Sequence, residues 1–233
     1  MRVFRGRAAT IAADRDVNHR LLSVAAGGEC AVRVWIPHRQ IAFGRRDTRL
    51  DGYRRAREAA REHGFPPVER DVGGRAVAYD GETTLAFARA EPTDDFRTGT
   101  ADRYDRATVD IEEALRSVDL EPIRGEPDDS FCPGTHSLSV ADETDGGRPR
   151  KLVGIAQRVQ QDAALVAGIV LVADRERLTD VLEGVYRTLG ISFDPASVGT
   201  VEDAGGQPGP ATVRTALEDA LIGDAQTTVT NVR

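Results

Sequence analysis

The stretch RDVGGRAVAYD, residues 70–80, decides more about the fold than any other part of the sequence. Its adjacent glycines, Gly73 and Gly74, let the backbone approach a ligand closely, and their N–H groups can face an anion or a carbonyl. Arg70 and Arg75 flank the glycines with guanidinium donors. The small residues that follow leave room for an extended apolar chain. From the spacing alone, a glycine-rich turn that leads into a hairpin is the simpler interpretation.

A second informative stretch lies further along the chain, at RPRKLVGIAQ, residues 148–157. Lys151 stands at the start of a predicted strand, where its ammonium can donate to a carbonyl or phosphoryl oxygen in a transition state. Gly154 and Ala156 leave one face of that strand nearly bare, as a ligand laid along a sheet requires. A surface lysine on a hairpin is the structural alternative.

The stretch SFCPGTH, residues 130–136, lies between these two and contains a candidate nucleophile. Cys132 precedes a Pro-Gly turn, where its sulfur can be accessible. His136, or nearby arginine and lysine groups, can favour the reactive thiolate. A small buried hydrophobe is the alternative for a lone cysteine. Cys30, at the start of a predicted strand, has no such surroundings and is interpreted as structural.

Hydrophobic periodicity around these stretches predicts helices over residues 12–25, 51–63, 102–118, 175–189 and 211–222. Short apolar or alternating runs predict strands over residues 31–36, 40–43, 76–79, 84–89, 137–140, 152–158 and 163–173. Asp80-Gly81, between two of these runs, predicts a hairpin. Because strands cluster between helices without regular βαβ alternation, we expect an α+β fold, an α/β layer in which helices flank a mixed, mostly antiparallel central sheet.

Composition and charge exclude several kinds of function. The 31 basic residues are 30 arginines and Lys151, and with 38 acidic residues they leave a net charge of −7. No basic stripe follows a helix or loop, so we expect no nucleic-acid partner. No apolar run reaches the roughly 18 residues of a membrane span, and no signal peptide is recognisable. Two cysteines and no Cys/His cluster with zinc spacing predict a cytoplasmic protein without a metal site.

The three stretches, in this order and spacing, resemble the lipoate–protein ligase and octanoyltransferase superfamily, which shares its fold with the biotin ligase catalytic domain. Residues 70–80 look like its Arg-x-x-Gly-Gly-x-Ala-Val-x-x-Asp motif, and residues 151–157 look like its Lys-x-x-Gly-x-Ala-Gln motif. Phe43-Gly44-Arg45 is similar to a short signature at the end of an early strand. The resemblance implies the following acyl-binding residues: Arg70, Gly73, Gly74, Arg75, Ala76, Val77, Asp80, Gly154, Ala156 and Gln157.

Within the superfamily, the surroundings of Cys132 look most like those of the cysteine-dependent amidotransferases. That resemblance implies that Cys132 takes an octanoyl or lipoyl group from a carrier like the glycine cleavage H protein, as a thioester. Lys151 would stabilise the oxyanion, and the lysine of a lipoyl domain of a 2-oxoacid dehydrogenase would accept the acyl group, with no cofactor.

Two alternatives to the amidotransferase remain open. An ATP-dependent lipoate–protein ligase would need ATP and Mg²⁺ and would form a lipoyl adenylate. A non-catalytic protein would only bind lipoyl domains or free lipoate. In either enzymatic case, we expect a catalytic domain over residues 1–194. Residues 195–233 are expected to hold a linker, a short helix and, over residues 223–233, a polar tail.

Overall fold

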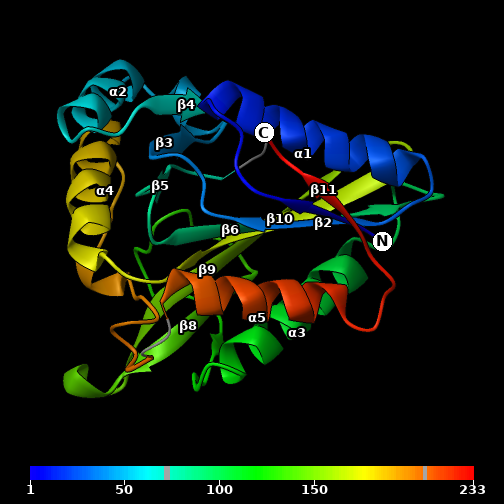
Figure 1. Ribbon diagram of the computed structural model, residues 1–233. Helices are drawn as coiled ribbons and strands as arrows, with labels where there is room; N and C mark the ends of the chain where they lie inside the picture. Colours follow the sequence, from blue (N-terminus) through cyan, green and yellow to red (C-terminus); the bar gives the residue numbers. More distant parts are fainter. Residues whose placement is uncertain (71–73, 207–208) are drawn as a thin grey trace.

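The computed structural model describes residues 1–70, 74–206 and 209–233, and its main feature is an eight-stranded sheet (Figure 1). Strands β11, β1 and β2 are parallel to one another, and all other neighbours in this sheet are antiparallel. The expected mixed, mostly antiparallel sheet is therefore confirmed. In spatial order the strands are β11 (Thr228–Asn231), β1 (Arg2–Arg5), β2 (Ala31–Trp35), β6 (Thr84–Pro92), β10 (Ala163–Leu171), β9 (Arg148–Val159), β8 (Ser137–Asp142) and β7 (Ile123–Arg124).

A second sheet of three strands stands beside the first, in the order β4 (Pro67–Glu69), β3 (Gln40–Phe43) and β5 (Val77–Tyr79). The predicted hairpin at Asp80-Gly81 is wrong, because β5 pairs with β3 whereas β6 pairs with β2 and β10. The carboxylate of Asp80 accepts the backbone N–H groups of Glu82, Thr83 and Thr84, each at 2.9 Å. This turn passes the chain from one sheet to the other.

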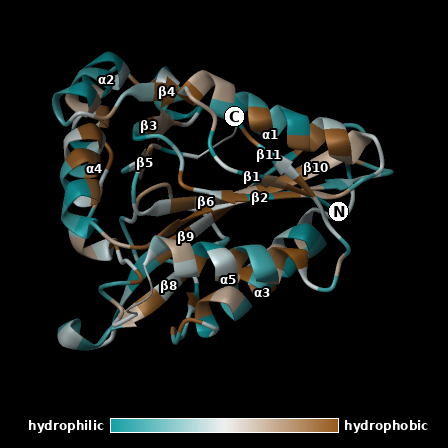
Figure 2. Ribbon diagram, in the orientation of Figure 1, coloured by the Kyte–Doolittle hydropathy of each residue, from teal (hydrophilic) through white to brown (hydrophobic). Residues whose placement is uncertain are grey.

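In the described part of the chain five α-helices cover the sheets, and each lies where periodicity predicted one. Helix α1 (Ile11–Ala26) packs on one face of the large sheet, and α3 (Thr100–Arg116) and α5 (Pro210–Ile222) pack on the other (Figure 1). Helices α2 (Tyr53–Glu62) and α4 (Arg175–Leu189) pack together beside the small sheet. Figure 2 shows hydrophobic residues concentrated on the central strands between these helix layers, as burial of apolar surface requires.

The C-terminal segment is more closely integrated than the sequence indicated. Residues 223–233, expected to be a polar tail, contain β11, which pairs with β1. In the expected linker, Val198 and Val201 are fully buried, and Val198 forms a β-bridge with Lys151. Four-residue strands such as β1 and β11 give little signal because their pairing depends on partners distant in sequence. The division of the chain at residue 194 stays a prediction.

Candidate active site

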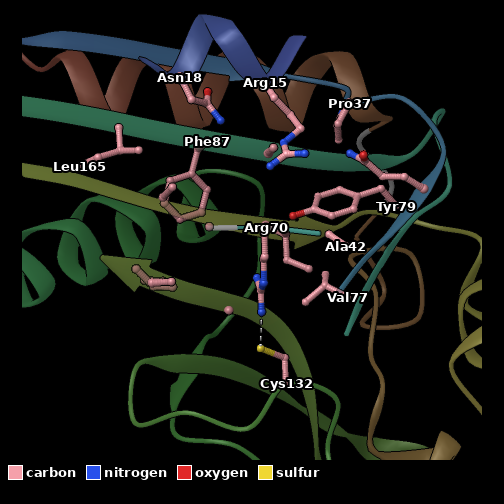
Figure 3. Close-up of a pocket in the computed structure, with 18 of the residues that line it drawn as sticks. Arg15, Asn18, Pro37, Ala42, Arg70, Val77, Tyr79, Phe87, Cys132 and Leu165 are labelled. Atoms are coloured by element: carbon pink, nitrogen blue, oxygen red, sulfur yellow. Dashed lines mark hydrogen bonds between the residues drawn. The ribbon is translucent and has the colours of Figure 1, made fainter. Parts of the chain in front are cut away.

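A cavity of about 230 Å³ lies among α1, the two sheets and the loop that carries Cys132. Figure 3 shows Arg70 and Cys132 on one side of this cavity and Arg15 and Asn18 of α1 on the other. Apolar and small side chains form most of the wall between these two ends. They include Leu22, Trp35, Ala42, Val77, Ala86, Phe87, Ala156, Leu165 and Ala167. The cavity therefore suits an extended apolar group with a reactive end near Cys132.

Cys132 is held by both polar groups of its backbone in a conformation that is rare for a side-chain-bearing residue. Its φ is +42°, in the left-handed region. Its N–H donates to the hydroxyl of Tyr186 at 2.6 Å, and that hydroxyl donates to the carbonyl of Ala76 at 3.0 Å. Its carbonyl accepts a hydrogen bond from Lys151 at 3.0 Å. Outliers of this kind persist only where the surrounding structure fixes them, and they concentrate at functional sites.

Two donors contact the sulfur of Cys132. Nη2 of Arg70 lies 3.0 Å from Sγ, and the backbone N–H of Arg75 donates to Sγ at 3.3 Å. Burial acts to lower the pKa of Arg70, but the charges of Cys132, Tyr79 and Tyr186 and the hydrogen bond to Cys132 together outweigh it and leave the pKa raised. Arg70 is therefore a permanent cation beside the thiol, and a positive charge in that place stabilises a thiolate.

Glycines make this close approach possible. Gly74 has φ +92°, and a Cβ atom there would lie 2.7 Å from Nη2 of Arg70 and 2.8 Å from the sulfur of Cys132. A Cβ atom at Gly44 would collide with the carbonyl of Gly74. The end of β3 and the glycine-rich loop thus fit together backbone to backbone, as only glycine permits.

Lys151 faces the backbone of the Cys132 loop and not its sulfur. The side chain is 1% exposed, and Nζ donates to Oε2 of Glu126 at 2.7 Å. It also donates to the carbonyls of Phe131 at 2.9 Å and Cys132 at 3.0 Å. An ammonium has three N–H groups, so these contacts use all of them. The oxyanion role expected for Lys151 would require the loss of one of these bonds.

A family match covers most of the chain. Residues 13–222 match the family described as the lipoyl protein ligase A/B catalytic domain. The chain belongs to this family. Its fold is also that of a crystal structure of lipoate-protein ligase A bound with ATP, with a TM-score of 0.73 and 17% identity over 98% of this chain and 88% of that one.

Relatives of this chain include two proteins named octanoyl-[GcvH]:protein N-octanoyltransferase. The protein of Exiguobacterium sibiricum is 32% identical over 139 residues, which are 58% of this chain and 46% of the relative. The protein of Kyrpidia tusciae is 30% identical over 186 residues, which are 79% of this chain and 57% of the relative. The chain thus spans about half the length of these curated relatives.

The residues predicted to bind the acyl group do not all lie in one place. Five of them line the cavity, namely Arg70, Val77, Gly154, Ala156 and Gln157. Gly74 and Arg75 lie at the sulfur, and the carbonyl of Ala76 binds Tyr186. Asp80 serves the turn between β5 and β6 and is not among the lining residues. Gly73 lies outside the described residues.

Sequence reasoning missed two residues that contact the Cys132 loop, and it offered His136, which makes no contact with the thiol among the described residues. Glu126 and Tyr186 contact the Cys132 loop from positions that carry no motif. A sole lysine in a buried strand signals that some acid must pair with it, but not which one. His136 stacks on Tyr104, with ring centroids 3.7 Å apart, and is not among the described contacts of the thiol.

Within residues 1–70, 74–206 and 209–233, no group of three or more His, Cys, Asp or Glu residues is arranged to hold a metal ion. Over the same ranges, no helix combines the length and the apolar character that a membrane crossing needs.

Proposed function

We propose that this chain transfers octanoyl or lipoyl groups between protein lysines through a thioester on Cys132. The observation that carries the proposal is the setting of the thiol. Cys132 faces an apolar cavity, and its sulfur receives hydrogen bonds from the Arg70 guanidinium and the Arg75 N–H. This combination is that of an activated nucleophile beside a pocket for a hydrocarbon chain.

The reaction would proceed in two balanced steps. The Cys132 thiolate attacks the amide carbonyl of an acylated lysine on a donor protein, and a tetrahedral oxyanion forms. When the C–N bond breaks, the donor lysine leaves as an amine that takes up one proton, and the thioester remains on Cys132. An acceptor lysine, as the neutral amine, then attacks the thioester; the thiolate leaves, and the nitrogen gives up one proton to solvent, which balances the proton taken up in the first step. Because an amide is exchanged for an amide, the reaction needs no ATP.

The donors at the sulfur support a role for Arg70 and Arg75 in stabilising the oxyanion. The oxyanion forms one bond away from the carbon that the sulfur attacks, so donors beside Sγ are close to it. Nε of Arg70 is also buried and has no hydrogen-bond partner among the described residues. We assign Lys151 to holding the loop, because its three N–H groups are already bonded.

The acyl chain would lie along the small residues of β9 and β10 that line the cavity. Ala156 of β9 is directly opposite Ala167 of β10, and both line the cavity. Burying about eight carbons contributes about 6 kcal/mol before the cost of ordering the chain, at about 0.8 kcal/mol for each carbon. An apolar wall of this kind distinguishes acyl groups by the length of their chain more than by their functional groups.

Partners and cofactor follow from the same reaction. The relatives' names contain GcvH, so we infer a donor like the glycine cleavage H protein and lipoyl domains as acceptors. We infer no cofactor, since the acyl group is the substrate. Both cysteines are unpaired, which suits a reducing compartment such as the cytoplasm.

Intact-protein mass spectrometry tests this function. The chain is mixed with an octanoylated H protein and no ATP, and the wild type is compared with Cys132→Ala. We expect the octanoyl mass on the wild type alone, and its transfer when an unmodified lipoyl domain is added. No adduct on either protein, with acceptor modification only when lipoate and ATP are supplied, would overturn the proposal in favour of a ligase. Binding without any transfer would leave a carrier-binding protein.

A further inference from the structure

We propose that Glu126 is a positioning residue that, together with Lys151, holds the Cys132 loop in its reactive conformation. A role for Glu126 in acyl transfer rests on the proposed function. The contacts of Glu126 and Lys151 with the loop are independent of that function, because they concern only the conformation of the loop.

Glu126 gathers three hydrogen bonds with its two carboxylate oxygens. Oε1 accepts from the backbone N–H of Gly134 at 2.7 Å. Oε2 accepts from Nζ of Lys151 at 2.7 Å and from the hydroxyl of Ser137 at 2.9 Å. The side chain is 19% exposed. A carboxylate this well supplied with donors is held in one place and can fix its neighbours.

Lys151 forms hydrogen bonds to the backbone on the other side of the thiol. Its remaining N–H groups donate to the carbonyls of Phe131 and Cys132, immediately before the Pro-Gly turn. Glu126 holds Gly134, the glycine of that turn, on the other side of Cys132. The ion pair therefore fastens both sides of Cys132 and leaves its sulfur to Arg70 and Arg75.

The backbone of Cys132 explains why such a clamp is needed. A φ of +42° costs free energy in any residue with a side chain, so the loop relaxes unless its surroundings prevent it. Relaxation would carry the sulfur away from Nη2 of Arg70 and the N–H of Arg75, now 3.0 Å and 3.3 Å distant. Without Glu126, Lys151 would also be a buried cation with no counter-charge.

Alkylation of the two cysteines tests the clamp without any acyl donor. Glu126→Ala and Glu126→Gln are treated with iodoacetamide at neutral pH, and the rates at Cys132 and Cys30 are followed by peptide mass spectrometry. We expect Glu126→Ala to slow the reaction of Cys132 about tenfold, because the thiolate loses its two donors. Glu126→Gln keeps one acceptor oxygen and should show a smaller loss. Cys30 serves as an internal reference, and its rate should not change.

A matched control comes from the other side of β7, where Glu121 lies in the connection from α3. Glu121 is exposed, and no contact of its side chain is found among the described residues. Glu121→Gln removes the same charge as Glu126→Gln and should leave both alkylation rates at the wild-type value.

Transfer kinetics separate positioning from general support of the fold. With octanoylated H protein as donor, Glu126→Ala should lower kcat about tenfold to a hundredfold and leave KM within about twofold, since a displaced nucleophile impairs chemistry rather than docking. Lys151→Arg keeps the charge but changes the geometry of its donors, and should lower kcat as well.

Each contrary result has a distinct meaning. Wild-type alkylation of Cys132 in both Glu126 variants would overturn the inference. Faster labelling of both cysteines would also overturn it, because that result indicates loosening of the whole fold. If the wild type forms no acyl adduct, the proposed function fails, while the alkylation rates still decide whether Glu126 positions the thiol.

Discussion

Gly74 and Cys132 approach so closely that a Cβ atom at Gly74 would lie 2.8 Å from the sulfur. Gly74 also has φ +92°, where a side chain is strained in any surroundings. The contact joins the glycine-rich motif to the thiol, and it explains why the motif has a glycine at position 74. The second glycine of the pair is needed for space at the sulfur.

Gly74→Ala should therefore damage both activity and stability. We expect the new methyl group to displace Sγ or Arg70 and to lower the rate of Cys132 acylation at least tenfold. The positive φ should lower the free energy of unfolding by about 1 to 2 kcal/mol. Denaturant titration and intact-mass kinetics measure the two effects. Gly209→Ala is the control, because φ there is −67° and a Cβ atom would meet no described heavy atom within 4 Å.

Arg70→Lys tests whether the guanidinium does more than supply charge. Nη2 of Arg70 donates to the carbonyl of Arg75 at 2.7 Å and to the sulfur at 3.0 Å. A lysine keeps the charge but cannot reproduce this planar set of donors. We expect kcat/KM for transfer to fall about a hundredfold, the usual effect of losing one donor at an oxyanion site. Arg54→Lys, on the exposed side of α2, should keep wild-type kinetics, and equal losses in both variants would contradict the assignment.

The facing alanines of β9 and β10 should set the length of the acyl chain. Ala167→Leu adds three carbons to the cavity wall opposite Ala156. We expect the variant to lose the octanoyl adduct and to keep a butanoyl adduct on Cys132, because the added side chain fills the part of the cavity beside Ala156. Mass spectrometry with donors acylated by chains of four, six and eight carbons provides the comparison. Unchanged preference for eight carbons would place the chain elsewhere.

An ion pair outside the site should give the fold part of its pH dependence. Nε of Arg124 donates to Glu112 at 2.6 Å, and this bond, against the opposing effect of burial, lowers the pKa of Glu112 below its usual 4.5. A carboxyl with a lowered pKa contributes stability that is present above its usual pKa and is lost as pH falls through the lowered one.

Glu112→Gln should therefore reduce the free energy of unfolding by about 1 kcal/mol at pH 7. The deficit should shrink as pH falls below 4.5 and vanish once the carboxyl is protonated in both states. Denaturant melts at a series of pH values measure it. Glu113→Gln, the exposed neighbour on α3, should show no such trend, and a deficit that grows in acid would show that the sign is wrong.

Local patterns predicted most of the fold because the helices and long strands carry their own periodicity. Helix α4 lies over the predicted residues 175–189, since its apolar side chains recur at helical spacing. The hairpin predicted at Asp80-Gly81 was wrong because turn residues determine a bend in the chain but do not determine which strand the next one pairs with. The strands β1 and β11 escaped notice for a related reason, since each is stabilised by a partner more than 200 residues away.

In the candidate site, too, the motif residues could be predicted, and the contacts between residues far apart in the sequence could not. The resemblance to a known family implied that Cys132, Arg70 and Lys151 share one site, and the structure brings them together. The resemblance did not indicate that Lys151 donates to the loop backbone, because its partners lie 19, 20 and 25 residues away. Glu126 is one of 38 acidic residues, and nothing local distinguishes it from the others.

The hydroxyl of Tyr186 links the backbone of Cys132 to that of Ala76, and so ties together segments 54 and 110 residues away from it. A ribosome adds about 5 to 20 residues each second, so Cys132 emerges several seconds before its partner on α4. Throughout that interval the cysteine is an ordinary thiol on an incomplete chain. We therefore expect the reactivity proposed for Cys132 to appear only when α4 docks, late in synthesis, after the hydroxyl of Tyr186 has reached the loop.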